Sequence, residues 1–187
     1  MEVKTTFIEG VLLVQPQVFG DARGWFCETY NEARYREAGI METFVQDNQS
    51  YSQKNVVRGL HFQRPPFTQA KLVSVIRGAV LDVAVDLRRN SPTYGQYFSA
   101  LLSGENHLQL FVPKGFAHGF SVLENDTVFA YKCSNLYNKE SEGSIIYNDP
   151  TIAVDWQVEN PIISEKDQNG VLFRDFLTPF DMLLLKK

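Results

Sequence analysis

The chain has few cysteines, no strongly basic stretch and no long apolar run. Its two cysteines, Cys27 and Cys133, are too few for a disulfide-stabilised scaffold. The formal net charge of -4 and the lack of a basic tract argue against nucleic acid as a partner. No segment approaches the length of a membrane-spanning helix, and Met1-Glu2-Val3-Lys4 is not followed by an apolar signal region. We therefore expect a cytoplasmic protein that binds neither nucleic acid nor a membrane.

Apolar and aromatic residues are present in amounts typical of a folded protein. Of the 187 residues, 44% are hydrophobic and 14 are phenylalanine, which argues against a disordered chain. This length fits one domain with a sizeable core. Because no linker, internal repeat or low-complexity tract interrupts the chain, residues 1–187 are expected to form a single domain.

Short strands separated by turns dominate the pattern, which predicts an all-β sandwich, jelly roll or small barrel. Helices are few: one is expected from Asn31 to Ala38, with Asn31 as N-cap and Gly39 at its end, and a short apolar turn follows Thr178-Pro179. The pairs of strands expected on either side of a turn are 72–76 with 80–87 as a hairpin through Arg77-Gly78, 97–102 with 108–112, and 116–123 with 127–134.

Two segments hold most of the polar residues that suggest chemistry, Val57–Gln63 and Pro113–Phe120. Their spacing resembles that of the cupin-type jelly roll, whose metal-binding members use three histidines and a glutamate. Here the corresponding positions hold His61, Gln63, Lys71 and His118. Lysine offers only donors, and an ammonium group would repel a divalent ion. We therefore expect no metal, and a pocket that uses histidine and lysine for proton chemistry.

Strand periodicity predicts which of these side chains share a face. In 57–63, His61 and Gln63 lie on one face, whereas Arg58 lies on the other. In 44–48, Gln46 and Asn48 share a polar face within an otherwise apolar strand. Polar residues inside a small barrel usually line a ligand cavity, because burying them without partners is costly.

Ten motifs follow one another along nearly the whole chain: Asp21–Gly24, Phe44–Asn48, Arg58–Gln63, Lys71–Val73, Asp82–Arg88, Ser91–Gly95, Pro113–Phe120, Tyr131-Lys132, Asn148–Pro150 and Ile163–Asp167. In their order and spacing, these motifs resemble the dTDP-4-dehydrorhamnose 3,5-epimerase family. The resemblance implies a homodimeric jelly roll that converts dTDP-4-dehydro-6-deoxy-D-glucose to dTDP-4-dehydro-L-rhamnose, for dTDP-L-rhamnose synthesis, without metal or redox cofactor.

The resemblance implies four catalytic residues. A ketone at carbon 4 of the sugar acidifies the hydrogens on carbons 3 and 5, so inversion needs a base, a group that stabilises the enolate oxygen, and a proton donor on the opposite face. His61 would be the base, oriented by Asp167, and Tyr131 the donor. Lys71 would stabilise the oxygen by roughly 3 kcal/mol if it acts like one oxyanion-hole donor, and Asp82 would hold Lys71 in place.

Simpler interpretations of these residues remain open. Tyr131 could be an ordinary barrel aromatic, and Lys71 a lysine at a strand edge. Ser164-Glu165-Lys166-Asp167 could be a capping box that opens a short helix, which would give Asp167 a purely structural role.

The substrate also needs recognition of its nucleotide. A diphosphate favours guanidinium groups, so Arg23 and Arg58 are the candidates. The resemblance also implies that residues near the N-terminal strand, Arg23, Phe26 and Glu28, act across a dimer interface. The remaining candidate binding residues are Gln46, Asp47, Asn48, His118, Tyr137, Glu142 and Lys166.

Three other functions fit the same fold. The first is a relative that inverts one carbon only, or isomerises the ketosugar. The second is a metal-dependent cupin, which Gln63 and Lys71 argue against. The third is a sugar-binding jelly roll without catalysis, for which the joint presence of His61, Lys71 and Tyr131 would be coincidence.

Overall fold

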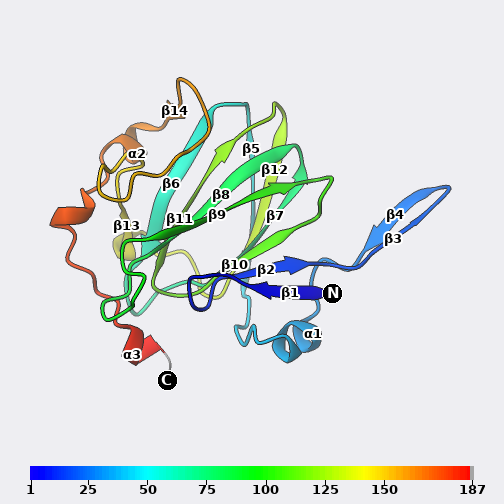
Figure 1. The fold of residues 1–187 in the computed structure, drawn as a ribbon, viewed down its shortest axis with the longest axis horizontal. Helices are drawn as coiled ribbons and strands as arrows, with labels where there is room; N and C mark the ends of the chain where they lie inside the picture. The colour runs from blue at the N-terminus through cyan, green and yellow to red at the C-terminus, as the bar shows by residue number, and fades with distance from the viewer. Residues whose placement is uncertain (186–187) are drawn as a thin grey trace.

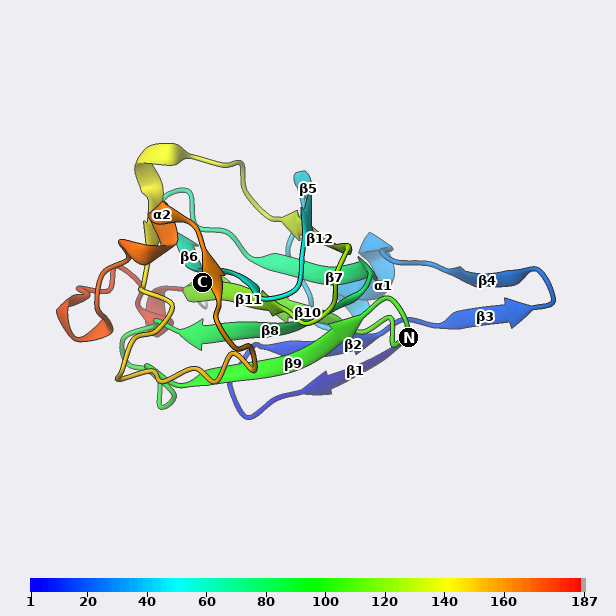
Figure 2. The same ribbon diagram turned by 90° about the horizontal axis from the view of Figure 1, so that it is seen from above.

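Two antiparallel sheets face each other and enclose the core in the computed structural model, which describes residues 1–185 (Figures 1 and 2). This architecture confirms the expected all-β jelly roll. The first sheet has the order β1 (Glu2–Thr5), β2 (Leu12–Gln15), β10 (Gln109–Val112), β7 (Lys71–Arg77), β12 (Thr127–Cys133) and β5 (Gln46–Ser52). The second has the order β13 (Glu142–Ser144), β6 (Val56–Gln63), β11 (Phe116–Val122), β8 (Ala79–Asp86) and β9 (Tyr97–Ser103), and β14 (Ile162–Ile163) pairs in parallel with β6.

The expected hairpin between β7 and β8 is wrong. Both strands form, but β7 pairs with β10 and β12 in the first sheet, whereas β8 pairs with β9 and β11 in the second. The chain crosses between the sheets at Gly78, whose φ is +79° and whose added Cβ would lie 2.2 Å from Thr127 Oγ1. Local alternation could not reveal this, because a hairpin and a crossover both need strands on either side of a tight turn.

The core has three parts: two lie on either side of the second sheet, and in the third Tyr35 and Ile40 pack against Leu72 of the first sheet. Val80 and Ala84 of β8 face the first sheet and pack in the barrel interior with Phe120. The alternate residues of β8, such as Val83, face outward and are covered by the C-terminal segment, including Trp156. Because β8 is buried on both faces, all of its residues except two aspartates are apolar.

The helices are short and peripheral. The expected N-terminal helix is confirmed as α1 (Glu32–Glu37): Asn31 Oδ1 accepts a hydrogen bond from the Arg34 amide at 3.3 Å, and Gly39 has a φ of +93°. The expected C-terminal turn contains α3 (Met182–Leu185). The other helical turns are η1 (Lys139–Ser141), α2 (Glu165–Gln168) and η2 (Phe173–Asp175). No helix within residues 1–185 is long and apolar enough to cross a membrane.

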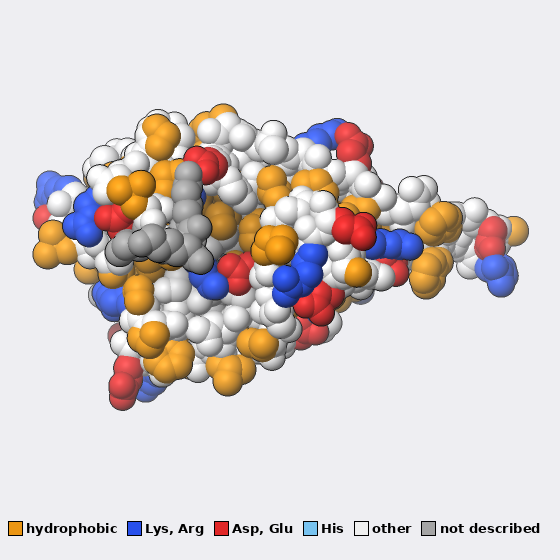
Figure 3. Space-filling model, turned by 90° about the horizontal axis from the view of Figure 1, so that it is seen from below, with side chains coloured by type: hydrophobic (Ala, Val, Ile, Leu, Met, Phe, Trp, Pro, Cys, Tyr) orange, Lys and Arg blue, Asp and Glu red, His pale blue; other side chains and the backbone are white. Residues whose placement is uncertain are grey.

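A hairpin of β3 (Val18–Asp21) and β4 (Gly24–Cys27) projects away from the barrel (Figure 1). In the view from below, hydrophobic side chains lie along this projection and charged ones at its tip (Figure 3). Phe19, Trp25 and Phe26 are 58%, 61% and 67% exposed. Three large exposed aromatics on one isolated hairpin are unusual for a surface that only water contacts.

Candidate active site

A β-bulge in β6 sets the positions of the polar side chains at the open edge of the barrel. On β11, His118 pairs with His61 and Phe120 pairs with Arg58, so the intervening Gly59 and Leu60 oppose a single residue. The prediction that Arg58 and His61 lie on opposite faces is therefore wrong, because the extra residue shifts the alternation and both face the barrel interior. Gly59 has a φ of +137°, and a Cβ there would lie 2.5 Å from the Gly119 Cα.

A cavity of about 190 Å³ opens between the two sheets at this edge. It brings together three of the four predicted catalytic residues, His61 from β6, Lys71 from β7 and Tyr131 from β12. The lining residues are Gln46, Asn48, His61, Phe62, Gln63, Gln69, Lys71, Tyr131, Cys133, Tyr137 and Glu142.

The fourth predicted residue, Asp167, lies beside this cavity in contact with His61. Its Oδ1 is 2.5 Å from His61 Nε2, and its Oδ2 accepts a 3.4 Å hydrogen bond from the Gly59 amide. Burial acts to raise the pKa of Asp167, but the hydrogen bond and charge of His61, together with hydrogen bonds from Gly59 and Ser164, lower it overall. Asp167 can therefore remain ionised and orient the imidazole, leaving the other ring nitrogen to act as a base.

The capping interpretation of the same segment is also correct. Ser164 is the N-cap of α2, and its Oγ accepts a 3.2 Å hydrogen bond from the Asp167 amide. The backbone of Asp167 serves the cap while its carboxylate contacts His61, so the two interpretations are compatible.

Lys71 and Tyr131 lie close together on neighbouring strands of the first sheet, on the same wall of the cavity. Lys71 Nζ lies 5.7 Å from the centroid of the Tyr131 ring. Burial lowers the pKa of Lys71, with the charges of Cys133, Asp82 and Glu142 opposing the shift. Burial likewise raises the pKa of Tyr131. A protonated phenol and a cation of reduced pKa suit a proton donor and a group that stabilises a developing oxyanion.

Asp82 binds a different partner from the one expected. Its two carboxylate oxygens lie 2.9 and 3.0 Å from His118 Nε2, and it acts on Lys71 through its charge. His118 is buried, and its ring stacks on that of Phe129 with 6.2 Å between the ring centroids. It lies below the cavity and is not among the residues that line it. Burial lowers the pKa of His118 despite the neighbouring carboxylate.

Gln63, which occupies a presumed metal-ligand position, is used to hold two loops. Its Nε2 donates to the carbonyls of Phe67 and Leu136 at 2.7 and 3.1 Å, and its Oε1 accepts from the Asn138 amide at 2.7 Å. In the described part of the chain, no three His, Cys, Asp or Glu side chains come together in a way that could hold a metal ion.

Several candidate binding residues form a connected rim at the cavity mouth. Gln46 Nε2 donates to Asn48 Oδ1 at 3.0 Å, and Gln46 Oε1 accepts from the Tyr137 amide at 2.9 Å. Glu142 accepts hydrogen bonds from Tyr137 and Lys166. Asp47 does not join this rim, because it points to the outer face of the sheet, where it pairs with Lys132 at 2.9 Å and is largely exposed.

Arg58 does not line the cavity itself but lies near Tyr131, anchored by Ser52. Its Nε and one terminal nitrogen donate to Ser52 Oγ at 3.2 and 3.1 Å. The positive charge of Arg58 reaches Tyr131 and opposes the rise in the pKa of that phenol, which burial dominates. Arg58 can therefore contact an anionic part of a ligand whose reacting part lies between His61 and Tyr131.

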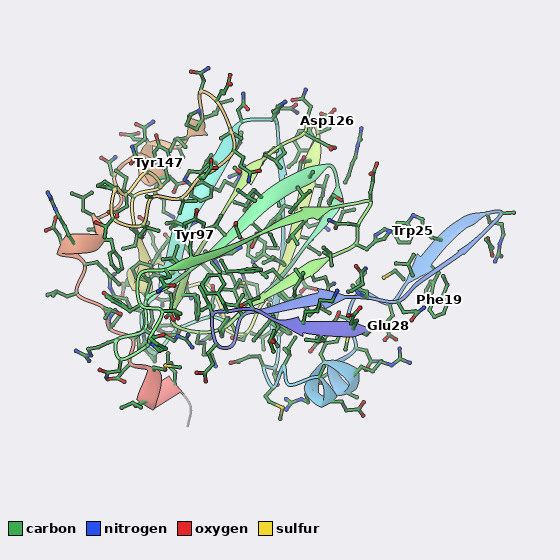
Figure 4. The ribbon with its side chains drawn as sticks, in the orientation of Figure 1. Phe19, Trp25, Glu28, Tyr97, Asp126 and Tyr147 are labelled. Atoms are coloured by element: carbon green, nitrogen blue, oxygen red, sulfur yellow. The ribbon has the colours of Figure 1, made fainter. Side chains whose placement is uncertain are left out.

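Three candidate binding residues lie away from this cavity in the single chain. Arg23 is at the tip of the β3–β4 hairpin, where it pairs with Asp21 at 2.5 Å, and Phe26 lies on β4. Glu28 follows the hairpin and pairs with Arg34 at 3.0 Å. Figure 4 shows Glu28, Phe19 and Trp25 at the hairpin side of the molecule, beyond the open barrel.

Sequence reasoning missed Cys133 as a residue of the cavity. It follows Tyr131 by two positions on β12, so strand periodicity could have placed both on the same face. Its Sγ accepts a 3.7 Å hydrogen bond from Asn48 Nδ2.

A larger hollow of about 410 Å³ lies on the outer face of the first sheet. Its lining includes Leu72, Ser74 and Ile76, which alternate along β7 with the inward-facing Lys71 and Val73. Neither His61 nor Lys71 lines this hollow. Tyr131 lines both spaces, but His61 and Lys71 join it only in the smaller cavity, which is therefore the candidate active site.

The fold and the cavity define a jelly-roll protein with acid–base residues between its two sheets. The family model for dTDP-4-dehydrorhamnose 3,5-epimerase matches residues 5–175. The chain therefore belongs to the dTDP-4-dehydrorhamnose 3,5-epimerase family.

Individual relatives agree with this assignment. A dTDP-4-dehydrorhamnose 3,5-epimerase from Shigella flexneri is 49% identical over 176 residues, covering 94% of this chain and 97% of that protein. A Legionella pneumophila epimerase solved with dTDP-4-keto-L-rhamnose has a TM-score of 0.90 and 48% identity, covering 94% of both chains. A 3'-monoepimerase from Streptomyces bikiniensis, solved with dTDP-quinovose, has a TM-score of 0.89 and 28% identity, covering 97% of this chain and 93% of that one.

Proposed function

We propose that this protein converts dTDP-4-dehydro-6-deoxy-D-glucose to dTDP-4-dehydro-L-rhamnose by inverting carbons 3 and 5, in the synthesis of dTDP-L-rhamnose. The observation that carries the proposal is the convergence of the His61–Asp167 pair, Lys71 and Tyr131 on one cavity. Membership of the epimerase family and the relatives described above support the choice of substrate.

In the proposed reaction, His61 removes the proton from carbon 3 or carbon 5, and the electron pair moves toward the carbon-4 oxygen to form an enolate. Lys71 stabilises the negative charge on that oxygen. Tyr131 then donates a proton to the same carbon from the opposite face, and the two residues regain their starting protonation through solvent. Repetition at the other carbon gives the double epimer without a net change in atoms or electrons.

The nucleotide part would extend along the rim of the cavity. Arg58 would bind a phosphate, and Gln46, Asn48 and Tyr137, which line the cavity, would offer polar and aromatic contacts for the nucleotide. We further propose that the protein acts as a cytoplasmic homodimer in which the hairpin carrying Arg23 and Phe26 completes the partner's site. The exposed aromatics of that hairpin support this arrangement.

A second candidate is a single-carbon epimerase. The Streptomyces bikiniensis 3'-monoepimerase has nearly the same fold, so the fold itself does not separate the two activities. Double inversion is favoured because the family model and the more similar relatives are 3,5-epimerases.

Incubation with the ketosugar nucleotide in deuterated water tests the proposal and separates these candidates. We expect deuterium at both carbon 3 and carbon 5, together with the L-rhamno product, measured by NMR. Deuterium at carbon 3 alone would identify a monoepimerase. Binding without any exchange would contradict catalysis, and loss of activity in chelator would contradict a metal-independent reaction.

A further inference from the structure

A carboxylate at the wall of the cavity needs a physical explanation if the ligand carries a diphosphate. Among the described residues that line the cavity, Glu142 alone is acidic. Two like charges brought close together repel, most strongly where water is partly excluded. Glu142 would therefore weaken substrate binding unless its charge is already balanced by a protein partner.

Glu142 has two such partners, from two different segments. Lys166 Nζ donates to its Oε1 at 2.5 Å, and the Tyr137 hydroxyl donates to its Oε2 at 3.1 Å. The Glu142 side chain is 21% exposed and that of Lys166 54%, so the ion pair lies at the surface of the rim. An ion pair at such a site contributes little to overall stability. We therefore expect the Glu142–Lys166 ion pair to affect the neighbouring residues of the cavity more than the overall stability of the protein.

The local effect follows from where Lys166 is attached. Lys166 belongs to α2, a helix of four residues, and the next residue is Asp167, which contacts His61. Glu142 belongs to β13, which pairs with β6 so that Glu142 lies opposite Gln63 and Ser144 lies opposite His61. The contacts thus form a closed ring that runs from His61 through the β6–β13 ladder, Glu142, Lys166 and Asp167 back to His61.

We propose that Glu142 is a positioning residue: by holding Lys166, it keeps the short helix α2 seated so that Asp167 stays on His61. The backbone of α2 is flanked by β14 on one side and by the bridge between Ile145 and Val171 on the other. The Glu142–Lys166 pair adds a side-chain contact between these two anchors, beside Asp167. Without it, the two backbone anchors, the Asp167 contacts and the Ser164 cap would still hold this turn, but the Lys166 side chain would no longer tie it to β13.

The charge of Glu142 also reaches the other reacting groups. It opposes the burial that lowers the pKa of Lys71, and it adds to the burial that raises the pKa of Tyr131. Glu142 therefore acts on these reacting groups through its charge, as well as holding α2 through Lys166.

Steady-state kinetics on four variants test this inference, which rests on the proposed epimerase function. Glu142→Gln keeps an acceptor for Tyr137 but breaks the ion pair, and Lys166→Met breaks it from the other side. We expect each to lower kcat about threefold to tenfold with a smaller change in KM, and the double variant to be no worse than the poorer single one. Lys166→Arg should recover most of the kcat, because it restores a cation.

A matched control uses the ion pair between Glu32 and Arg36 on α1, which lies outside the cavity. Glu32→Gln and Arg36→Met should leave kcat unchanged. Additive losses in kcat for the Glu142 and Lys166 variants, or weaker dTDP binding with unchanged kcat, would overturn the positioning role. Absence of turnover in the unmodified protein would instead contradict the proposed function, so the two failures are distinguishable.

Discussion

His61 and His118 lie directly opposite each other on β6 and β11, and each contacts its own aspartate. The His61 side chain is 29% exposed in the cavity, whereas that of His118 is 7% exposed below it. Only His61 therefore combines a carboxylate partner with access to a ligand. The paired arrangement is consistent with the proposed proton transfer by His61 and leaves His118 buried beneath the cavity, although both histidines sit in similar sequence patterns.

Replacing the proposed base should stop proton transfer at both carbons. His61→Ala is expected to lower kcat by at least about 10³-fold and to abolish deuterium exchange at carbons 3 and 5, while dTDP binding persists. Asp167→Asn should lower kcat by about 10²-fold, because the ring loses its orienting carboxylate. NMR exchange and calorimetric titration with dTDP measure both effects, and retained exchange in His61→Ala would require another base.

Removing the proposed donor should separate exchange from inversion. Tyr131→Phe keeps the ring that packs near Phe129 at 5.9 Å and removes only the hydroxyl. Because His61 can still form the enolate, we expect continued deuterium incorporation with little inverted product, or a singly inverted sugar. Equal loss of exchange and inversion would show that Tyr131 acts earlier, and full epimerisation would leave it as an ordinary barrel aromatic.

Lys71 should favour catalysis at the expense of stability. Burial lowers its pKa in the folded chain below its usual 10.5, so the unfolded state holds this proton more tightly. Burying charged Lys71 destabilises the fold by its full amount at pH values below the pKa of Lys71 in the folded chain. This cost decreases as the pH rises from that pKa toward 10.5, the usual pKa of lysine. Lys71→Met should therefore raise the melting temperature at pH 7, by about 2–4 °C per kcal/mol gained, while turnover is lost.

Calorimetric melting at several pH values checks this expectation. The difference in melting temperature between Lys71→Met and the unmodified protein should shrink as pH rises above the folded pKa. An unchanged or lower melting temperature at pH 7 would show that Lys71 has stabilising contacts that outweigh the cost of burying its charge.

Arg58 should contribute directly to nucleotide binding. Arg58→Ala is expected to weaken dTDP binding by roughly 1.5–3 kcal/mol, the scale of charge-assisted hydrogen bonds. Ser52→Ala is the matched variant, because it removes only the acceptor that holds Arg58, and should cost less than about 1 kcal/mol. Unchanged dTDP affinity in Arg58→Ala with lost turnover would place the diphosphate elsewhere.

Mixing two inactive variants tests the proposed role of the hairpin across a dimer. If Arg23 serves the partner's site, a hybrid of Arg23→Ala and His61→Ala subunits contains one intact site, so mixing after mild dissociation should restore up to about a quarter of the activity. A mixture of His61→Ala and Tyr131→Phe should restore none, because both residues lie in the same cavity. A fully active monomer in sedimentation analysis would contradict the trans role.

The sequence predicted correctly those features that depend only on residues close together along the chain. Alternation along β8 and β12, the N-cap at Asn31 and the cap at Ser164 were all predictable, because each depends on neighbouring residues. The residue type at position 71, a lysine where a metal-binding cupin has a carboxylate, was also enough to indicate acid–base chemistry.

The tertiary structure decided which strands pair and which side chains meet. The crossover at Gly78 and the bulge at Gly59 depend on strands far along the chain, so local periodicity predicted a hairpin and the wrong face for Arg58. The contact between His61 and Asp167 joins residues 106 positions apart. Residue types and alternation thus determined the class of fold and chemistry, whereas the geometry of the site arises only when two sheets pack around a shared core, because burial free energy is a property of the whole chain.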